Sequence, residues 1–169
     1  MRTATGTLPL EVAADAVRET CEMQLGLALR ALPPCDCRGG DAEGWCHSGI
    51  DLATHGGCWR LTLVVDALSA CQLAQSLYAL DPDDEPVHEE LADALNELVN
   101  IAAGVFKRDH RGSVMHLALP VFAMGWPDPE SSAGGQETVR LAAGAKDPQF
   151  HVLLGWMKTD ETGDGRDES

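Results

Sequence analysis

Apolar and polar positions follow two different periods along this chain, and these periods predict where its helices and strands lie. Apolar residues recur every three or four positions in three segments, the predicted helices: residues 8–29, 67–80 and 86–111. Shorter apolar or alternating segments between turn residues are the predicted strands: residues 49–54, 59–65, 114–118, 121–125, 137–143 and 150–158. The short connections predict an α+β fold, with long helices packed on one side of a mainly antiparallel sheet.

The longest predicted helix, residues 86–111, is amphipathic. Its leucine, valine and phenylalanine side chains gather on one side of the helix. Its ends match helix signals, because Glu89 and Glu90 fall in the first turn and Lys107 and Arg108 in the last. At ~100° per residue, the polar side carries four residues within an arc of about 60°. They are Asp93, Glu97, Asn100 and Gly104.

A glutamate with an asparagine three residues later is common on exposed helix surfaces. Two features of the polar face indicate a binding site instead. Asn96 and Asn100 occupy mid-helix positions although asparagine is a poor helix former, and Gly104 costs a further ~1 kcal/mol relative to alanine. A glycine on this face also leaves the backbone open to a partner. We therefore expect the face to dock a partner, through these residues: Asp93, Asn96 and Gly104.

The two central polar groups suit different chemical tasks. A carboxamide can both donate to and accept from one water molecule, so Asn100 can position a nucleophile without acting as a base. The carboxylate of Glu97 can bind a cation. Together they suit the hydrolysis of a substrate that is already activated, as in phosphoryl transfer. Glu97 and Asn100 are therefore the candidate catalytic residues.

The charge of the chain narrows the classes of partner. The formal net charge is −15 with only 12 Lys and Arg residues, which argues against binding to nucleic acid. Much of this charge lies in residues 81–90 and near the end of the chain, where we expect a disordered acidic tail over residues 159–169. No apolar run approaches the length of a membrane span, and acidic residues interrupt the first segment, so neither a span nor a secretory signal is expected. We expect a cytoplasmic protein.

Six cysteines raise the question of metal binding and thiol chemistry. Without an export signal they are expected to be reduced. A structural zinc site is a minor alternative to free thiols, with these ligands: Cys35, Cys37, Cys46 and His47. Otherwise we expect no cofactor of the chain's own. A nucleophile built from Cys46 and His47, or from Cys71, lacks a third orienting group and is not favoured.

A weak internal repeat relates the two halves of the chain. Three positions of the first helix match the polar face of the long helix after a shift of 78 residues: Glu19 with Glu97, Glu22 with Asn100 and Gly26 with Gly104. Residues 50–53 and 139–142 are also alike. The repeat suggests a pseudo-two-fold domain whose first copy lacks the carboxamide.

Residues 93–104, with the sequence DALNELVNIAAG, resemble the functional helix of the CheC/CheX/FliY family of chemotaxis phosphatases. In that helix Glu-x-x-Asn is followed by an apolar residue and, one turn later, by glycine. Residues 48–52 resemble the family's strand after the first loop, and the single Glu-x-x-Asn is most similar to CheX members. The resemblance spans residues 8–158 and implies one CheC-like pseudo-two-fold domain. Many relatives have glycine at the position of Asn96.

The resemblance implies a phosphatase that hydrolyses the aspartyl phosphate of a CheY-like response regulator. It implies that Glu97 pairs with the regulator's active-site lysine and that Asn100 orients the attacking water, while Mg²⁺ belongs to the phosphorylated partner. It further implies a homodimer joined through its sheets, with one site per chain because Glu22 replaces the carboxamide in the first copy. The alternative is a non-catalytic CheX-like dimer that binds or scaffolds a signalling partner through the same face.

Overall fold

The structure is a computed structural model, and it describes residues 9–33, 44–110, 114–128 and 136–158. Within these ranges the chain forms three helices: α1 (Leu10–Leu25), α2 (Ala67–Leu77) and α3 (His88–Asp109). The strands are β1 (Arg30–Leu32), β2 (Trp45–Ala53), β3 (Gly57–Asp66), β4 (His116–Leu117), β5 (Val121–Met124), β6 (Gln136–Ala142) and β7 (Gln149–Lys158).

The described strands form one antiparallel sheet with a pseudo-two-fold order. The order is β1-β6-β7-β3-β2-β4, and β5 also pairs with β2. Each half of the chain contributes a hairpin, β2–β3 or β6–β7, and the two hairpins meet where β3 pairs with β7. The strands that follow each long helix pair with the hairpin of the other half: β1 with β6, and β4 and β5 with β2. This exchange between halves confirms the expected α+β class and the pseudo-two-fold arrangement.

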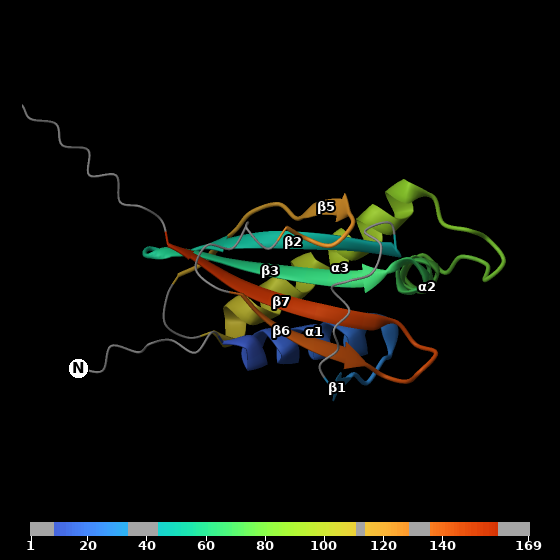
Figure 1. Cartoon of the computed structure of the whole chain (residues 1–169), viewed down its shortest axis with the longest axis horizontal. Helices are drawn as coiled ribbons and strands as arrows, with labels where there is room; N and C mark the ends of the chain where they lie inside the picture. Colours follow the sequence, from blue (N-terminus) through green and yellow to red (C-terminus); the bar gives the residue numbers. More distant parts are fainter. Residues whose placement is uncertain (1–8, 34–43, 111–113, 129–135, 159–169) are drawn as a thin grey trace, which may run out of the picture.

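The helices α1 and α3 lie side by side over one face of the sheet, and α2 lies at the end of β3 (Figure 1). Successive residues of β2 point to opposite faces, which brings Ile50 and Leu52 under the helices. The apolar side of α3 packs on them through Leu98, Val99 and Phe106, all of which are fully buried. Because this side of α3 is in the core, the polar side of the same helix is directed away from the sheet.

Local signals explain where the second and third helices begin. Asp66 caps α2 by accepting a hydrogen bond from the Ser69 N–H at 2.7 Å, as expected. At the start of α3, the Glu90 carboxylate accepts a longer bond from the Val87 N–H, at 3.4 Å. The basic Lys107 lies in the last turn of α3, where it opposes the negative end of the helix dipole. These interactions are local in sequence, and the predicted starts were within two residues of the observed ones.

The first helix is shorter than predicted, and a strand after it was missed. The helix ends at Leu25, not at Leu29, because Gly26 adopts a left-handed backbone conformation with φ of +66°. The chain then forms β1, which pairs Arg30 with Ala142 of β6. The apolar spacing continues past Gly26 and mimics a helix, whereas the partner strand lies far away in the sequence.

Other boundaries also differ from the prediction. Strand β2 begins at Trp45, four residues earlier than expected, because its first residues pair with both β3 and β5. The predicted strand over residues 114–118 is reduced to β4, and α2 ends at Leu77 before reaching Leu80. These ends depend on which backbone groups find partners, and the apolar pattern alone does not determine that.

Some expectations fall on segments outside the described residues. The predicted acidic tail, residues 159–169, is one of them, and Cys35 and Cys37 of the possible zinc site are others. Among the helices that are described, none combines the length and the apolar character needed to cross a membrane.

Candidate functional site

The polar face of α3 forms part of a groove of about 600 Å³. Four residues of α3 line the groove: Asp93, Glu97 and Asn100 from the polar face, and Asn96 at its edge. All of them are exposed except Asn96, which is half-buried. Glu97 and Asn100 are three positions apart on the helix and are therefore surface neighbours. The fold thus brings together four of the five residues that were expected at the site.

The fifth expected residue, Gly104, lies one turn beyond Asn100 and is not among the residues that line the groove. It is half-buried, and a Cβ atom added there would meet no atom within 4 Å. The helix surface at Gly104 is therefore open, and its docking role stays a prediction.

Side chains from three other parts of the fold complete the groove. They are Gln24 near the end of α1, Leu77 and Tyr78 at the end of α2, and Leu119 and Pro120 between β4 and β5. Leu119 is 86 % exposed and Tyr78 is 44 % exposed. The groove thus combines apolar side chains that are open to solvent with the acidic face of α3, which suits a partner with both apolar and cationic groups.

Hydrogen bonds to neighbouring elements hold these segments in place. Strands β4 and β5 pair with β2 on either side of the segment that carries Leu119, and the Ala118 N–H donates to the Asp51 carbonyl at 2.9 Å. On α2, the side-chain amide of Gln75 donates to the backbone carbonyls of Pro82 and Asp84, at 3.2 and 3.1 Å. The acidic loop before α3 is therefore tied back to α2.

The groove carries negative charge. Burial, and after it the charges of Asp93, Glu97 and Glu90, raise the pKa of Tyr78 above its ordinary value, so the phenol stays protonated at neutral pH and remains a hydrogen-bond donor. Among the described groups of the chain, none forms an ion pair or hydrogen bond with the Glu97 carboxylate. This carboxylate is therefore available to a cation from a partner.

Asn96 is turned toward the sheet. Its Oδ1 accepts a hydrogen bond of 2.6 Å from the hydroxyl of Ser48, which is fully buried on β2. The side chain therefore reaches from α3 to β2, although one edge of it still lines the groove.

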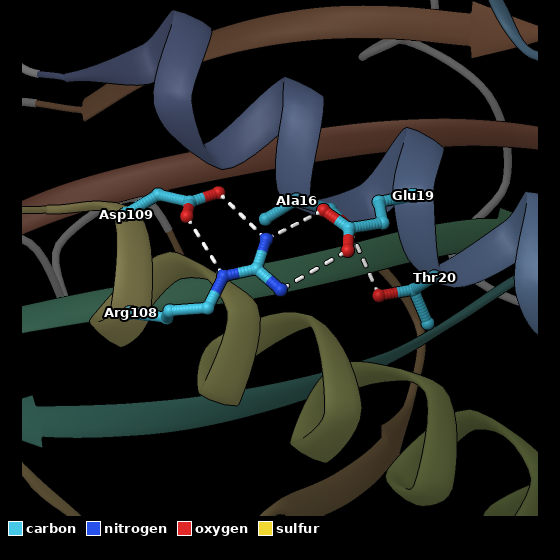
Figure 2. Close-up of polar contacts among 5 residues, drawn as sticks. All are labelled: Ala16, Glu19, Thr20, Arg108 and Asp109. Atoms are coloured by element: carbon cyan, nitrogen blue, oxygen red, sulfur yellow. Dashed lines mark hydrogen bonds and ion pairs between the residues drawn. The ribbon is translucent and has the colours of Figure 1, made fainter.

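The equivalent carboxylate on the first helix is already paired within the chain. Figure 2 shows the guanidinium of Arg108, from the last turn of α3, between the carboxylates of Glu19 on α1 and Asp109. Its two terminal nitrogens lie 2.8 and 3.2 Å from the Glu19 oxygens. Gly26 also differs from its counterpart, because it ends α1 whereas Gly104 lies inside α3. The two helices thus occupy equivalent positions in the fold, but Glu97 on α3 can bind a cation from a partner, whereas Glu19 on α1 is already ion-paired.

The cysteine chemistry considered from sequence finds little support among the described residues. Cys46 is buried under the helices, whereas His47 points to the opposite face of β2 and its Nδ1 lies 2.8 Å from the Gly125 carbonyl oxygen. These two residues cannot share a metal ion or act together on a substrate. Burial, followed by the charges of Asp66 and Cys71, also raises the pKa of Cys46 to about 11, which keeps it a thiol. No cluster of three or more metal-ligand side chains occurs in the described ranges.

Sequence reasoning missed the parts of the groove outside α3. Tyr78 is the single tyrosine of the chain and precedes the acidic loop, which is a weak signal of a special position. Leu119 and Ser48 carry no signal of this kind, since an isolated leucine before a proline and a serine in an alternating strand are both common. Their place at the site follows from strand pairing with β2.

The fold is shared with solved structures of chemotaxis proteins. CheX from Vibrio vulnificus has a TM-score of 0.71 at 16% identity, covering 88% of this chain and 95% of its own. A complex from Borrelia burgdorferi that contains CheX, CheY, BeF3 and Mg²⁺ has a TM-score of 0.68 at 21% identity, with coverage of 88% and 97%. FliY from Thermotoga maritima reaches 0.62 at 13% identity and covers 86% of both chains. At these identities the likeness concerns the fold.

Sequence comparison gives the family independently of the fold. No curated protein matches the chain. The sequence profile described as chemotaxis phosphatase CheX matches residues 52–139, which is just over half of the chain and includes α3 with Glu97 and Asn100. The chain therefore belongs to the CheX family of chemotaxis phosphatases.

Proposed function

We propose that this chain hydrolyses the aspartyl phosphate of a CheY-like response regulator. Glu97 pairs with the active-site lysine of the regulator, and Asn100 enters the regulator's site and orients the attacking water. Asp93, Asn96 and Gly104 belong to the docking face around them. The chain needs no cofactor of its own, because Mg²⁺ is bound by the phosphorylated regulator.

The observation that carries this proposal is the difference between two related glutamates. Glu19 forms an ion pair with Arg108, whereas Glu97 has no partner among the described groups and stands beside an exposed carboxamide in a groove. A free carboxylate next to Asn100 suits a lysine and a water molecule that arrive with a partner protein. The complex of Borrelia burgdorferi CheX with CheY, BeF3 and Mg²⁺ supports a regulator of this kind, since BeF3 is chemically similar to a phosphoryl group.

The reaction requires little covalent chemistry from the chain. Water attacks phosphorus, the bond between phosphorus and the aspartyl oxygen breaks, and the products are an aspartate carboxylate and inorganic phosphate. The proton lost by water passes to a phosphate oxygen or to solvent. Because the aspartate carboxylate is a good leaving group, holding one water in line with the bond that breaks accounts for the acceleration. A side-chain nucleophile is unnecessary.

The proposal is tested with the CheY-like response regulators encoded in the same genome as this chain, which are called receivers below. Each receiver is phosphorylated with acetyl phosphate in the presence of Mg²⁺, and the excess acetyl phosphate is then removed. With substoichiometric amounts of the chain, we expect one receiver to lose its phosphoryl group at least tenfold faster than it does alone, over several turnovers. If a receiver binds but decays at its own rate, the chain is a non-catalytic scaffold and the enzyme proposal is wrong.

Glu97→Gln is expected to weaken binding of the receiver more than it slows the chemical step. Loss of the charge removes the attraction to the lysine, so the Kd for the receiver loaded with Mg²⁺ and BeF3 rises about three- to tenfold, and binding depends less on salt. Fluorescence anisotropy at two ionic strengths measures both effects. Glu89→Gln is the matched control, because Glu89 is an exposed carboxylate of α3 that does not line the groove. An equal effect of both variants would contradict the role given to Glu97.

We also propose that the chain is a homodimer joined through its sheets, as the resemblance to CheX implies. Light scattering coupled to size-exclusion chromatography is expected to give a mass of twice 18.0 kDa at micromolar concentration. A mass of one chain at micromolar concentrations would contradict the proposed dimer, but it would not contradict the function proposed for the groove.

A further inference from the structure

Ser48 brings a buried hydroxyl to the helix layer beneath the groove. It lies on β2 with 0 % exposure, and its Oγ is 2.6 Å from Oδ1 of Asn96. In the described part of the chain this is the hydroxyl's only hydrogen bond. A buried hydroxyl is costly unless its proton finds an acceptor, so Ser48 donates and the Asn96 oxygen accepts.

This hydrogen bond determines whether the oxygen or the nitrogen of the Asn96 carboxamide is free to bind a partner in the groove. With Oδ1 held by Ser48, the free end is Nδ2, which carries two protons and has no hydrogen-bond partner among the described groups. The opposite orientation would leave the Ser48 proton without an acceptor. Asn96 lies four positions before Asn100, which makes the two side chains surface neighbours, and both line the same groove as Glu97.

We propose that Asn96 offers its Nδ2–H group as a second, fixed donor to an oxygen atom of the docked receiver, with Ser48 as the positioning residue behind it. The inference rests on the proposed function, because it takes the phosphorylated receiver as the partner. The hydrogen bond to Ser48 holds the carboxamide before the partner arrives, so little rotational freedom is lost on binding. The acceptor is an oxygen of the phosphoryl group or a main-chain carbonyl.

The inference predicts the direction in which the Kd for the receiver changes when the Asn96 side chain is removed. A side chain at this position can either contact the partner, so that its removal raises the Kd, or obstruct the partner, so that its removal lowers the Kd. If Asn96 is a donor, Asn96→Ala raises the Kd for the receiver about fivefold, the value of one neutral hydrogen bond, and at least tenfold if the acceptor is charged. If Asn96 obstructs the approach, Asn96→Ala and Asn96→Gly lower the Kd. A lower Kd overturns the inference.

Comparison of two states of the receiver identifies the acceptor. The Kd is measured for the receiver with Mg²⁺ and BeF3 and for the same receiver with Mg²⁺ alone. A loss of affinity in Asn96→Ala that is confined to the first state identifies a phosphoryl oxygen, whereas an equal loss in both states identifies a main-chain carbonyl. Either pattern supports the donor role, and no loss in either state contradicts it.

A double-mutant cycle tests whether Ser48 acts through Asn96. Ser48→Ala leaves the amide in place but frees it to rotate, so the Kd should rise about twofold. In the Asn96→Ala background, Ser48→Ala should then have no further effect on the Kd. A merely structural role of Ser48 would weaken binding equally in both backgrounds. Thermal unfolding of all variants shows whether each one is folded.

Asn96→Asp separates the donor from the hydrogen bond to Ser48. The carboxylate still accepts from Ser48 but has no proton to donate, so the Kd should rise at least tenfold. Gln24→Glu adds the same charge to the groove and gives the size of the charge effect alone. If the two variants have equal effects, the donor role is wrong.

The outcome also distinguishes this inference from the proposed function. If the wild-type chain neither binds nor dephosphorylates any receiver, the proposed function fails. If the wild-type chain is active, Asn100→Ala is inactive and Asn96→Ala binds as well as wild type, then only the role of Asn96 is overturned.

Discussion

Asn100→Ala is expected to lower the kcat for hydrolysis of the receiver's aspartyl phosphate by about 100-fold. The carboxamide is the proposed group that holds the attacking water in line, and misplacement of a reacting group by about 1 Å can cost a factor of this size. The Kd for the receiver should change much less, because Glu97 and the walls of the groove remain. Phosphate release under single-turnover conditions measures the chemical step separately from binding.

Loss of stability cannot account for this loss of activity. Asn100 is exposed in the middle of α3, and alanine is a better helix former there by about 0.5 kcal/mol, so the variant should be slightly more stable than wild type. Asn100→Asp is a second test, because it keeps the shape of the side chain but cannot donate a hydrogen bond. Glu89→Ala, on the same helix but outside the groove, should keep full activity. An Asn100→Ala variant with at least half of the wild-type kcat would contradict the proposed mechanism.

Phe106→Ala is expected to lower the free energy of unfolding by about 3–5 kcal/mol. Phe106 is fully buried on the apolar side of α3, where its ring packs edge-on against Trp59 and stacks on His110. Removing the ring leaves a cavity between the long helix and the sheet. The loss should appear as a lower midpoint of urea unfolding with an unchanged slope.

Two variants indicate whether this effect comes from the core contact. Phe106→Leu keeps most of the buried volume and should cost less than about 1.5 kcal/mol. Lys107→Ala changes an exposed neighbour and should shift the free energy by no more than about 0.5 kcal/mol. If Phe106→Ala costs less than about 1 kcal/mol, the packing of α3 on the sheet is not as described.

The candidate site was only partly predictable from sequence. The polar face of α3 follows from the helical period, because Asp93, Glu97 and Asn100 share one side of a helix whose other side is apolar. The remaining parts of the groove come from α1, from the end of α2 and from the segment between β4 and β5. No local pattern joins these segments, since they meet only when the helices and strands pack.

The orientation of Asn96 is another feature that the sequence alone does not predict. Its position next to Glu97 is visible in the sequence, but whether it fills the groove or turns away is not. The direction of its side chain depends on the Ser48 hydroxyl, 48 positions earlier in the chain. Similarly, Glu19 and Glu97 look alike in the repeat, and Arg108 at the end of α3 pairs with only the first of them.

The sequence by itself determined the three helices, six of the seven described strands, the α+β class and the amphipathic face that presents Glu97 and Asn100, because these depend on periods of two and 3.6 residues within short segments. Only the tertiary structure decided that β1 is a strand and that Ser48 holds Asn96. It also decided that Arg108 forms an ion pair with Glu19 and leaves Glu97 available to a partner. Each of these depends on a hydrogen bond or ion pair between segments far apart in the chain, and such partners become neighbours only when the sheet and its helices have assembled.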